Sequence, residues 1–109
     1  MATQGLVSVT QGGETIIKIV AGCDGYNASE LANKIKAMKQ VAVQSAYNTA
    51  KKVGFGCDDC LVVVGEDTIL YKGEGKLHAR YRKTFSDPMF NPRWEHGTAD
   101  HTEIVEIGG

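Results

Sequence analysis

Residues 14–21, ETIIKIVA, are apolar on both faces of an extended chain. Successive side chains of a strand point to opposite faces, so Ile17 and Ile19 share one face while Ile16 and Val20 share the other. A strand with two apolar faces has to bury both of them. The sequence therefore predicts a central strand that is covered on both sides of its sheet.

A hairpin turn precedes this strand. Gly12 and Gly13 form a dipeptide typical of a tight turn, which makes residues 5–11 the predicted partner strand. Two apolar stripes at helical spacing follow, and no proline or glycine separates them. The stripes comprise Leu31, Ala32, Ile35 and Met38, then Val43, Ala46, Tyr47, Ala50 and Val53. They form either two helices or one bent helix, and Gly54 is expected to end the helical region.

Runs of strand-like sequence follow the helices at residues 61–64, 68–71, 77–85 and 98–107. We therefore predict an α+β fold: an antiparallel sheet of about five or six strands, with one or two consecutive helices packed on one face. The chain has 109 residues and contains neither linkers nor internal repeats. Residues 1–109 are accordingly predicted to form a single domain.

The composition restricts which partners the protein is expected to bind. The net charge is −1, which provides no general basic surface for duplex nucleic acid. No apolar run approaches the roughly 20 residues of a membrane-spanning helix. The N-terminal sequence MATQGLVSVT lacks the basic and apolar blocks of a signal peptide. These features predict a cytosolic protein that binds neither duplex nucleic acid nor a membrane.

The three cysteines fit that location, because an odd number cannot pair completely into intrachain disulfides. Cys57 and Cys60 have the C-x-x-C spacing of metal and redox sites. A zinc site would need Cys23 and a histidine to complete four ligands, and the aspartates inside the motif disfavour the thiolate that redox chemistry requires. We therefore predict reduced structural cysteines at a helix-to-strand turn, with no metal and no cofactor.

The segment after the central strand, GCDGYN at residues 22–27, joins a strand to a helix. Asn27 and Glu30 have the spacing of a capping box, with Asn27 in the place of the usual Ser or Thr. A junction of this kind also presents backbone N–H groups to an anion. The glycine spacing matches neither dinucleotide-binding nor P-loop motifs, so a plain turn into a helix is favoured over an anion site.

An aromatic segment, FSDPMFNPRW at residues 85–94, contains both prolines and the single tryptophan. Each proline fixes its own φ and disfavours helix at the residue before it, so an extended loop is predicted. Its rings, amide and guanidinium suit a nucleotide-like ligand, although the same rings would serve equally well in a core. A basic stripe leads into the loop, formed by His78, Arg80, Arg82 and Thr84. This stripe either extends a ligand surface or protects an edge strand with charge.

Three motifs, read together, resemble a known family. They are IVAGCDGYNASELA at residues 19–32, FGCDDCLVVV at residues 55–64 and YRKTFSDPMFNPRWEHGTAD at residues 81–100. In this order and spacing they look like the type one Thoeris anti-defence family of bacteriophages, over nearly the whole chain. The resemblance implies a protein that acts in the cytoplasm of the infected bacterial host. There it would sequester, without cleaving, the cyclic ADP-ribose isomer that the Thoeris immune system makes as an alarm signal.

The resemblance also implies self-assembly and a second class of ligand. Members of that family form homodimers that can assemble into hexamers, as trimers of dimers. Some of them also hold cyclic di- or trinucleotides of CBASS-type immunity at separate sites. Whether this chain has the second activity stays open.

Residue chemistry assigns candidate roles in binding such a ligand. Each candidate offers a ring for adenine, an amide for base or ribose edges, a guanidinium for the pyrophosphate, or a carboxylate for ribose hydroxyls. The rings are those of Phe90, Tyr26 and Trp94, and the amides are those of Asn91 and Asn27. The guanidinium groups belong to Arg93, Arg82 and Arg80, and the carboxylates belong to Asp24 and Asp100. A domain this small has little room for a deep pocket of its own, so the ligand is predicted to lie at a homodimer interface.

Two other functions remain open on the residues alone. His78, His96, His101 and Asp100 give some support to a small phosphodiesterase-like hydrolase of a cyclic nucleotide, but no nucleophile motif accompanies them. The aromatic loop would also suit a module that docks a partner protein and binds no small molecule. The resemblance favours a binding protein that is not an enzyme.

Overall fold

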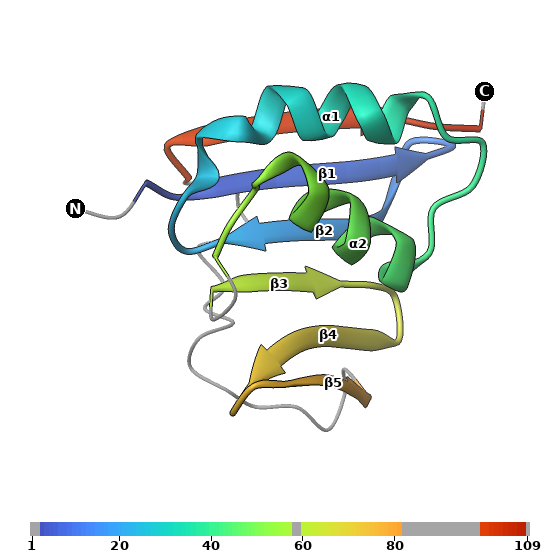
Figure 1. Cartoon of the computed structure of the whole chain (residues 1–109). Helices are drawn as coiled ribbons and strands as arrows, with labels where there is room; N and C mark the ends of the chain where they lie inside the picture. The colour runs from blue at the N-terminus through green and yellow to red at the C-terminus, as the bar shows by residue number, and fades with distance from the viewer. Residues whose placement is uncertain (1–2, 58–59, 82–98, 109) are drawn as a thin grey trace.

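The computed structural model describes residues 3–57, 60–81 and 99–108, and it has the predicted α+β architecture (Figure 1). Its strands are β1 (Gly5–Gln11), β2 (Glu14–Ala21), β3 (Leu61–Val64), β4 (Thr68–Gly73), β5 (Lys76–Tyr81) and β6 (His101–Glu106). Its helices are the short 3-10 turn η1 (Gly25–Asn27), α1 (Ala28–Lys36) and α2 (Val43–Val53). Within the described ranges, no helix is long and apolar enough to cross a membrane.

The strands form one sheet in the order β5-β4-β3-β2-β1-β6. Neighbouring strands are antiparallel except β1 and β6, which are parallel. The predicted antiparallel sheet is confirmed for β1 to β5, whereas β6 is parallel to its neighbour β1. Strands β5 and β6 lie at opposite edges of the sheet, so β6 pairs with β1 and not with the strand that precedes it in the chain.

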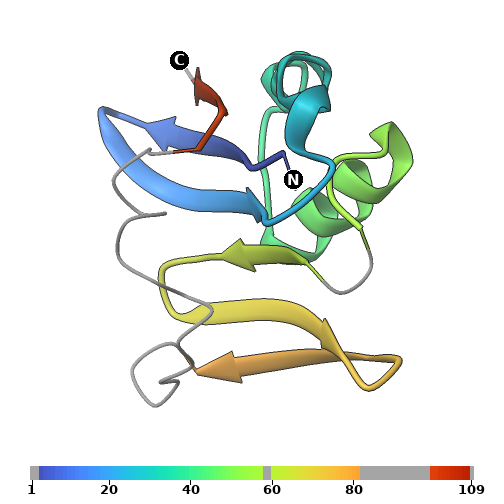
Figure 2. The same cartoon turned by 90° about the vertical axis from the view of Figure 1, so that its left-hand side faces the viewer.

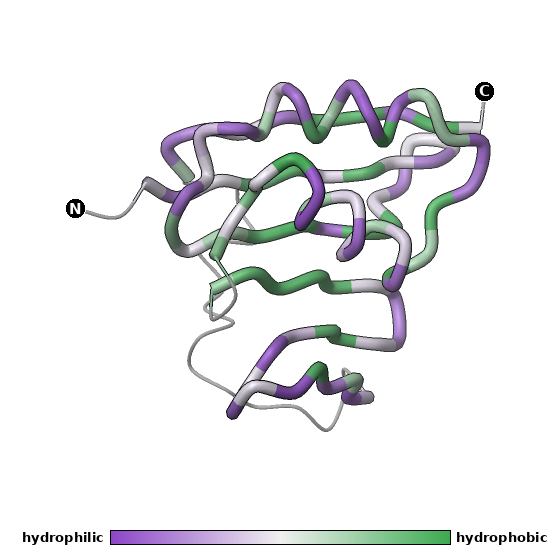
Figure 3. Tube along the Cα trace, viewed as in Figure 1, coloured by the Kyte–Doolittle hydropathy of each residue, from purple (hydrophilic) through white to green (hydrophobic). Residues whose placement is uncertain are grey.

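Strand β2 is central and covered on both faces, as its two apolar faces predict. Ile17 and Ile19 are buried on the face that carries the helices, and Val20 is buried on the opposite face. The neighbouring strand β3 repeats the pattern, with Val63 paired to Ile19 and Val62 paired to Val20. Figure 3 shows β3 as a continuously apolar strand.

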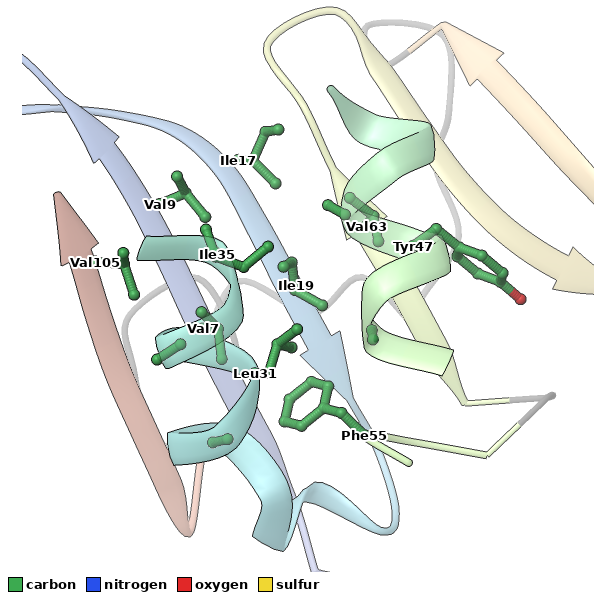
Figure 4. Packing of buried hydrophobic residues seen from close by; sticks show 14 of the residues in the cluster. Val7, Val9, Ile17, Ile19, Leu31, Ile35, Tyr47, Phe55, Val63 and Val105 are labelled. Carbon is green, nitrogen blue, oxygen red and sulfur yellow. The ribbon is translucent and has the colours of Figure 1, made fainter. Parts of the chain in front are cut away.

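Both helices pack on the same face of the sheet, α1 over β1 and β6 and α2 over β2, β3 and β4 (Figures 1 and 2). Their apolar stripes meet the sheet in one core, shown in Figure 4. Its largest fully buried side chains include Phe55, Ile19, Leu31, Ile35 and Val63. Burial of these side chains is the main force that holds the two layers together.

Two separate helices are present, so the alternative of one bent helix is wrong. Ala42 is extended (φ −104°, ψ 163°) and begins α2. The Ser45 hydroxyl accepts a hydrogen bond from the Ala42 N–H (2.9 Å) and donates one to the Ala42 carbonyl (3.0 Å). The Ser45 side chain, at the third helical position, thus caps α2. The chain ends α1 and begins α2 without a glycine or a proline between them.

The carboxyl of Glu106 fastens the end of β6 to the hairpin between β1 and β2. It accepts hydrogen bonds from the Thr10 hydroxyl and from the Gly13 N–H, the latter at 3.3 Å. The hydrogen bond from Thr10 is the main cause of a lowered pKa for Glu106; loss of hydration opposes it, and the N–H groups of Gly13 and Gly12 add to it.

We expect Glu106→Gln to make the protein less stable at pH 7 and to have less effect in acid. A carboxyl whose pKa is lowered by folding stabilises the protein above its unfolded pKa, and that contribution is lost as the pH falls through the folded pKa. The difference in urea midpoint between wild type and variant should therefore shrink below about pH 4.5. Glu66→Gln, at an exposed position in the β3–β4 turn, is the control. A difference that stays constant across this range would contradict the role of Glu106.

Candidate functional site

The candidate site lies at the end of the sheet where β1, β3 and β6 begin and β2 ends, on the left of Figure 1. Four segments that are far apart in the sequence meet there: residues 3–5, 22–27, 54–57 together with residue 60, and 99–101. Backbone hydrogen bonds connect all four of these segments. This end of the sheet therefore collects residues from all three of the motifs that resemble the anti-defence family.

The loop after β2 is tied to the segment that precedes β3. The Gly22 N–H donates to the carbonyl of Cys60 (3.0 Å), and the Gly56 N–H donates to the carbonyl of Asp24 (2.9 Å). Between these two bonds Asp24 adopts a left-handed conformation (φ 54°, ψ 38°), which is uncommon for a residue with a side chain. The backbone at Asp24 is thus held on both sides in a turn that sends the chain into η1.

The same loop crosses directly over the start of β1. The Gly25 N–H donates to the carbonyl of Thr3 (2.9 Å). A Cβ atom on Gly25 would lie 2.6 Å from both the carbonyl carbon of Gln4 and the Cα of Gly5, which is closer than such atoms approach. Only glycine fits where two backbones come this close, so Gly25 sets the position of the residues around it.

The third motif reaches this end through Asp100. Its Oδ2 atom accepts a hydrogen bond from the Gln4 N–H (3.1 Å), and the next residue, His101, donates its N–H to the Gln4 carbonyl (3.1 Å). Asp100 is therefore held beside Gln4, while Gly25 is held against Thr3. The predicted site residues Asp24, Tyr26 and Asp100 are brought to one neighbourhood around the start of β1.

Tyr26 presents its ring to solvent at this neighbourhood, with 57% of its surface exposed. Large aromatic rings are usually buried, and an exposed one offers a flat surface for stacking. Asp24 is exposed as well. The two side chains therefore offer a stacking surface and a hydrogen-bond acceptor that a ligand can reach.

Asn27 has a structural partner that the sequence did not reveal. Its Nδ2 donates to the carbonyl of Val53 (2.9 Å) and lies 3.5 Å from that of Gly54, at the C-terminus of α2. The predicted capping box with Glu30 is wrong, because the Asn27 side chain makes no cap hydrogen bond to α1. Its amide instead satisfies carbonyls left over at the end of the other helix, which ties α1 to α2.

Arg80 is not brought to this end of the sheet. It lies on the edge strand β5, paired with Ile69 of β4, and the two strands β4 and β3 lie between β5 and β2. His78 shares its face and stacks on Tyr71, with ring centroids 5.2 Å apart, while its Nε2 lies 3.0 Å from the carbonyl of Gly73. His78 and Arg80 therefore share one face of β5, as the predicted basic stripe requires. The remaining predicted ligand residues lie outside the described residues: Arg82, Phe90, Asn91, Arg93 and Trp94.

The three cysteines converge at the same end, which the sequence prediction missed. Cys23 follows β2, and Cys57 and Cys60 precede β3. Each sulfur is in contact with the other two. Cys57 and Cys60 do lie at the helix-to-strand turn between α2 and β3 as predicted, whereas Cys23 lies at the strand-to-helix junction after β2, and the three form one cluster. Only pairing of β2 with β3 brings Cys23 to the C-x-x-C motif, and sequence spacing does not contain that information.

The hollows formed by described residues lie elsewhere. One, of about 410 Å³, lies between the start of α2 and the β3–β4 turn and includes Val43, Gly65 and Thr68. Another, of about 370 Å³, lies between the two helices and includes Glu30, Lys34 and Lys52. Neither is lined by a predicted ligand residue. At the candidate site itself, the side chains of Tyr26 and Asp24 are exposed.

Comparison of the chain with protein-family models, curated proteins and solved structures finds no match.

Proposed function

We propose that this protein binds and sequesters a cyclic ADP-ribose isomer without cleaving it, and so removes the alarm signal of the bacterial Thoeris system. The observation that carries the proposal is the convergence of the three family-like motifs at one end of the sheet. Gly22 and Gly56 join the first motif to the second, and Asp100 brings the third to the start of β1. Small-molecule sites combine apolar or aromatic surface with a few polar groups, and Tyr26, Asp24 and Asp100 offer both kinds of group at this end.

The chemistry at this end suits part of such a ligand. The exposed ring of Tyr26 would stack on adenine, and the carboxylates of Asp24 and Asp100 would accept hydrogen bonds from ribose hydroxyls. The negatively charged pyrophosphate has to be paired with cationic side chains. Arg80 is remote on β5, and so is Tyr81, the residue that precedes Arg82. We therefore assign that role to Arg93, together with stacking by Phe90 and Trp94 and an amide contact by Asn91.

The proposed site includes a second copy of the chain. A sponge has to enclose its ligand in order to release it slowly, whereas Tyr26 and Asp24 are exposed on a single chain. A pocket completed by a partner subunit meets that need. We therefore propose a homodimer, able to assemble further into a hexamer, with cyclic di- or trinucleotides as a possible second class of ligand.

Calorimetric titration of the purified protein with the cyclic ADP-ribose isomer tests this function. We expect tight binding, with the nucleotide recovered intact by chromatography after the complex is heated. Conversion of the nucleotide would identify a hydrolase of cyclic nucleotides. No heat and no retained nucleotide would leave a protein-docking module as the function to examine.

Replacing Tyr26 by Ala is expected to weaken ligand binding by about 1–3 kcal/mol, which is roughly 5- to 150-fold in Kd, because a stacked ring is lost. The matched control is Tyr81→Ala, at another half-exposed tyrosine located at the far end of β5. Its Kd should stay within twofold of wild type. Equal affinities for Tyr26→Ala and wild type, measured on folded protein, would exclude Tyr26 from the site.

A further inference from the structure

The cysteine cluster has more sulfur contacts than covalent pairing can use. The Cα atoms of Cys23, Cys57 and Cys60 are 5.4–6.3 Å apart, and all three pairs of sulfurs are in contact. Each sulfur can form a single disulfide, so at most one of the three pairs can be bonded. An arrangement that brings all three sulfurs to one point is explained by a single atom that all three bind.

The backbone around the cluster is fixed by hydrogen bonds on both sides. The bond from Gly22 N–H to the Cys60 carbonyl and the bond from Gly56 N–H to the Asp24 carbonyl enclose Cys23 and the C-x-x-C turn. Gly56 has a left-handed φ of 83°, which lets the chain turn just before Cys57. The three Cβ atoms are therefore directed to one place by the fold.

One sulfur, Sγ of Cys60, receives a hydrogen bond that suits a thiolate. The same sulfur lies 3.5 Å from the carbonyl oxygen of Cys23 and 3.7 Å from that of Cys57. The Cys57 N–H donates to Sγ of Cys60 at 3.1 Å, and the Cys60 N–H closes the turn on the Cys57 carbonyl at 3.2 Å. Hydrogen bonds from backbone N–H groups to sulfur stabilise its ionised form and tune metal-bound cysteines. All three cysteines are half-buried, so an ion can reach them and still be partly shielded from water.

We propose that Cys23, Cys57 and Cys60 bind one zinc ion as thiolates. Zinc is commonly bound by cysteine thiolates in tetrahedral geometry, with bonds of about 2.3 Å. The three ligand atoms of the cluster all lie within 4.8 Å of one another. An iron–sulfur cubane fits less well, because each of its cysteines binds a different corner of a larger cluster.

The proposed ion keeps one coordination position for another ligand. Among the described residues, no fourth Cys, His, Asp or Glu joins the group. A water molecule or a donor atom of a bound ligand would complete the tetrahedron. The ion would join the end of β2 to the start of β3, so it would add to the stability of the folded chain. This inference is independent of the proposed ligand.

Metal analysis of the native protein, produced without a metal-affinity tag in zinc-containing medium, tests the proposal. We expect one equivalent of zinc per chain after gel filtration. The same sample is then denatured with a chelator and no reductant, and alkylated for mass spectrometry. Three alkylated cysteines are expected, because metal-bound thiolates are released as thiols. Substoichiometric metal, or a single alkylated cysteine, which indicates a disulfide, would overturn the proposal.

Two further measurements test the site: the zinc content of variants, and the absorption spectrum of the protein with Co²⁺. Cys23→Ser should lose the bound zinc, whereas His101→Asn, at an exposed residue outside the cluster, should keep it. Because the cysteine variant itself can fail to fold, wild-type apoprotein is also titrated with Co²⁺. A thiolate-to-cobalt charge-transfer band that saturates at one equivalent and is displaced by zinc is expected, and its absence would count against the site.

Discussion

Replacing Gly25 by Ala is expected to destabilise the protein by about 3 kcal/mol or more, since overpacking against rigid backbone cannot be relieved by a change of rotamer. The added Cβ would lie 2.6 Å from backbone atoms of Gln4 and Gly5. The two segments would have to separate, which also strains the hydrogen bond from Gly25 to Thr3. Urea unfolding followed by circular dichroism measures the effect.

Gly73→Ala is the matched control. A Cβ on Gly73 would meet only side-chain atoms of His78 and Tyr71, at 3.5 Å or more, which is ordinary contact. Its effect should stay within about 1 kcal/mol, the range of a glycine-to-alanine change in a strand. A Gly25→Ala protein as stable as the control would show that the crossing over β1 is looser than described.

Replacing Phe55 by Ala is expected to cost about 3–5 kcal/mol of stability, as removal of a large buried ring does. Phe55 has no exposed surface and directly follows α2, where its N–H donates to the carbonyl of Ala50 (2.9 Å). Its ring lies against Gly5, where an added Cβ would be 2.6 Å from Cε1. The ring thus fills the core behind the candidate site.

Tyr26→Ala is the control for Phe55→Ala, because it removes a nearby ring that is largely exposed. Its effect on the free energy of unfolding should be at most about 0.5 kcal/mol, as for most surface substitutions. Similar losses for the two variants would contradict the assignment of Phe55 to the core and Tyr26 to the surface.

The sequence predicts elements well where a local pattern decides the structure. The Gly12-Gly13 turn, with φ values of 63° and 82°, and the two apolar faces of β2 both appear as predicted. The α+β class and the packing of the helices on one face follow from the same patterns. Each of these features depends on residues that are close in the chain.

Features that depend on distant partners were not predictable in this way. The parallel pairing of β6 joins it to β1, which lies near the other end of the sequence. Asn27 has typical capping spacing, yet it donates to Val53, 26 residues away. Cys23 joins Cys57 and Cys60 only because β2 pairs with β3. A single sequence contains no direct signal for these contacts.

Mapping amide shifts by heteronuclear NMR, as the cyclic ADP-ribose isomer is added, tests most directly whether this end of the sheet holds the ligand. The largest changes are expected at residues 4–5, 22–27 and 99–101, which the hydrogen bonds of Gly25 and Asp100 bring together. Amides at the opposite end, in the turns at residues 12–13 and 65–67, should change little. Changes centred on those turns, or none at all, would contradict the proposed site.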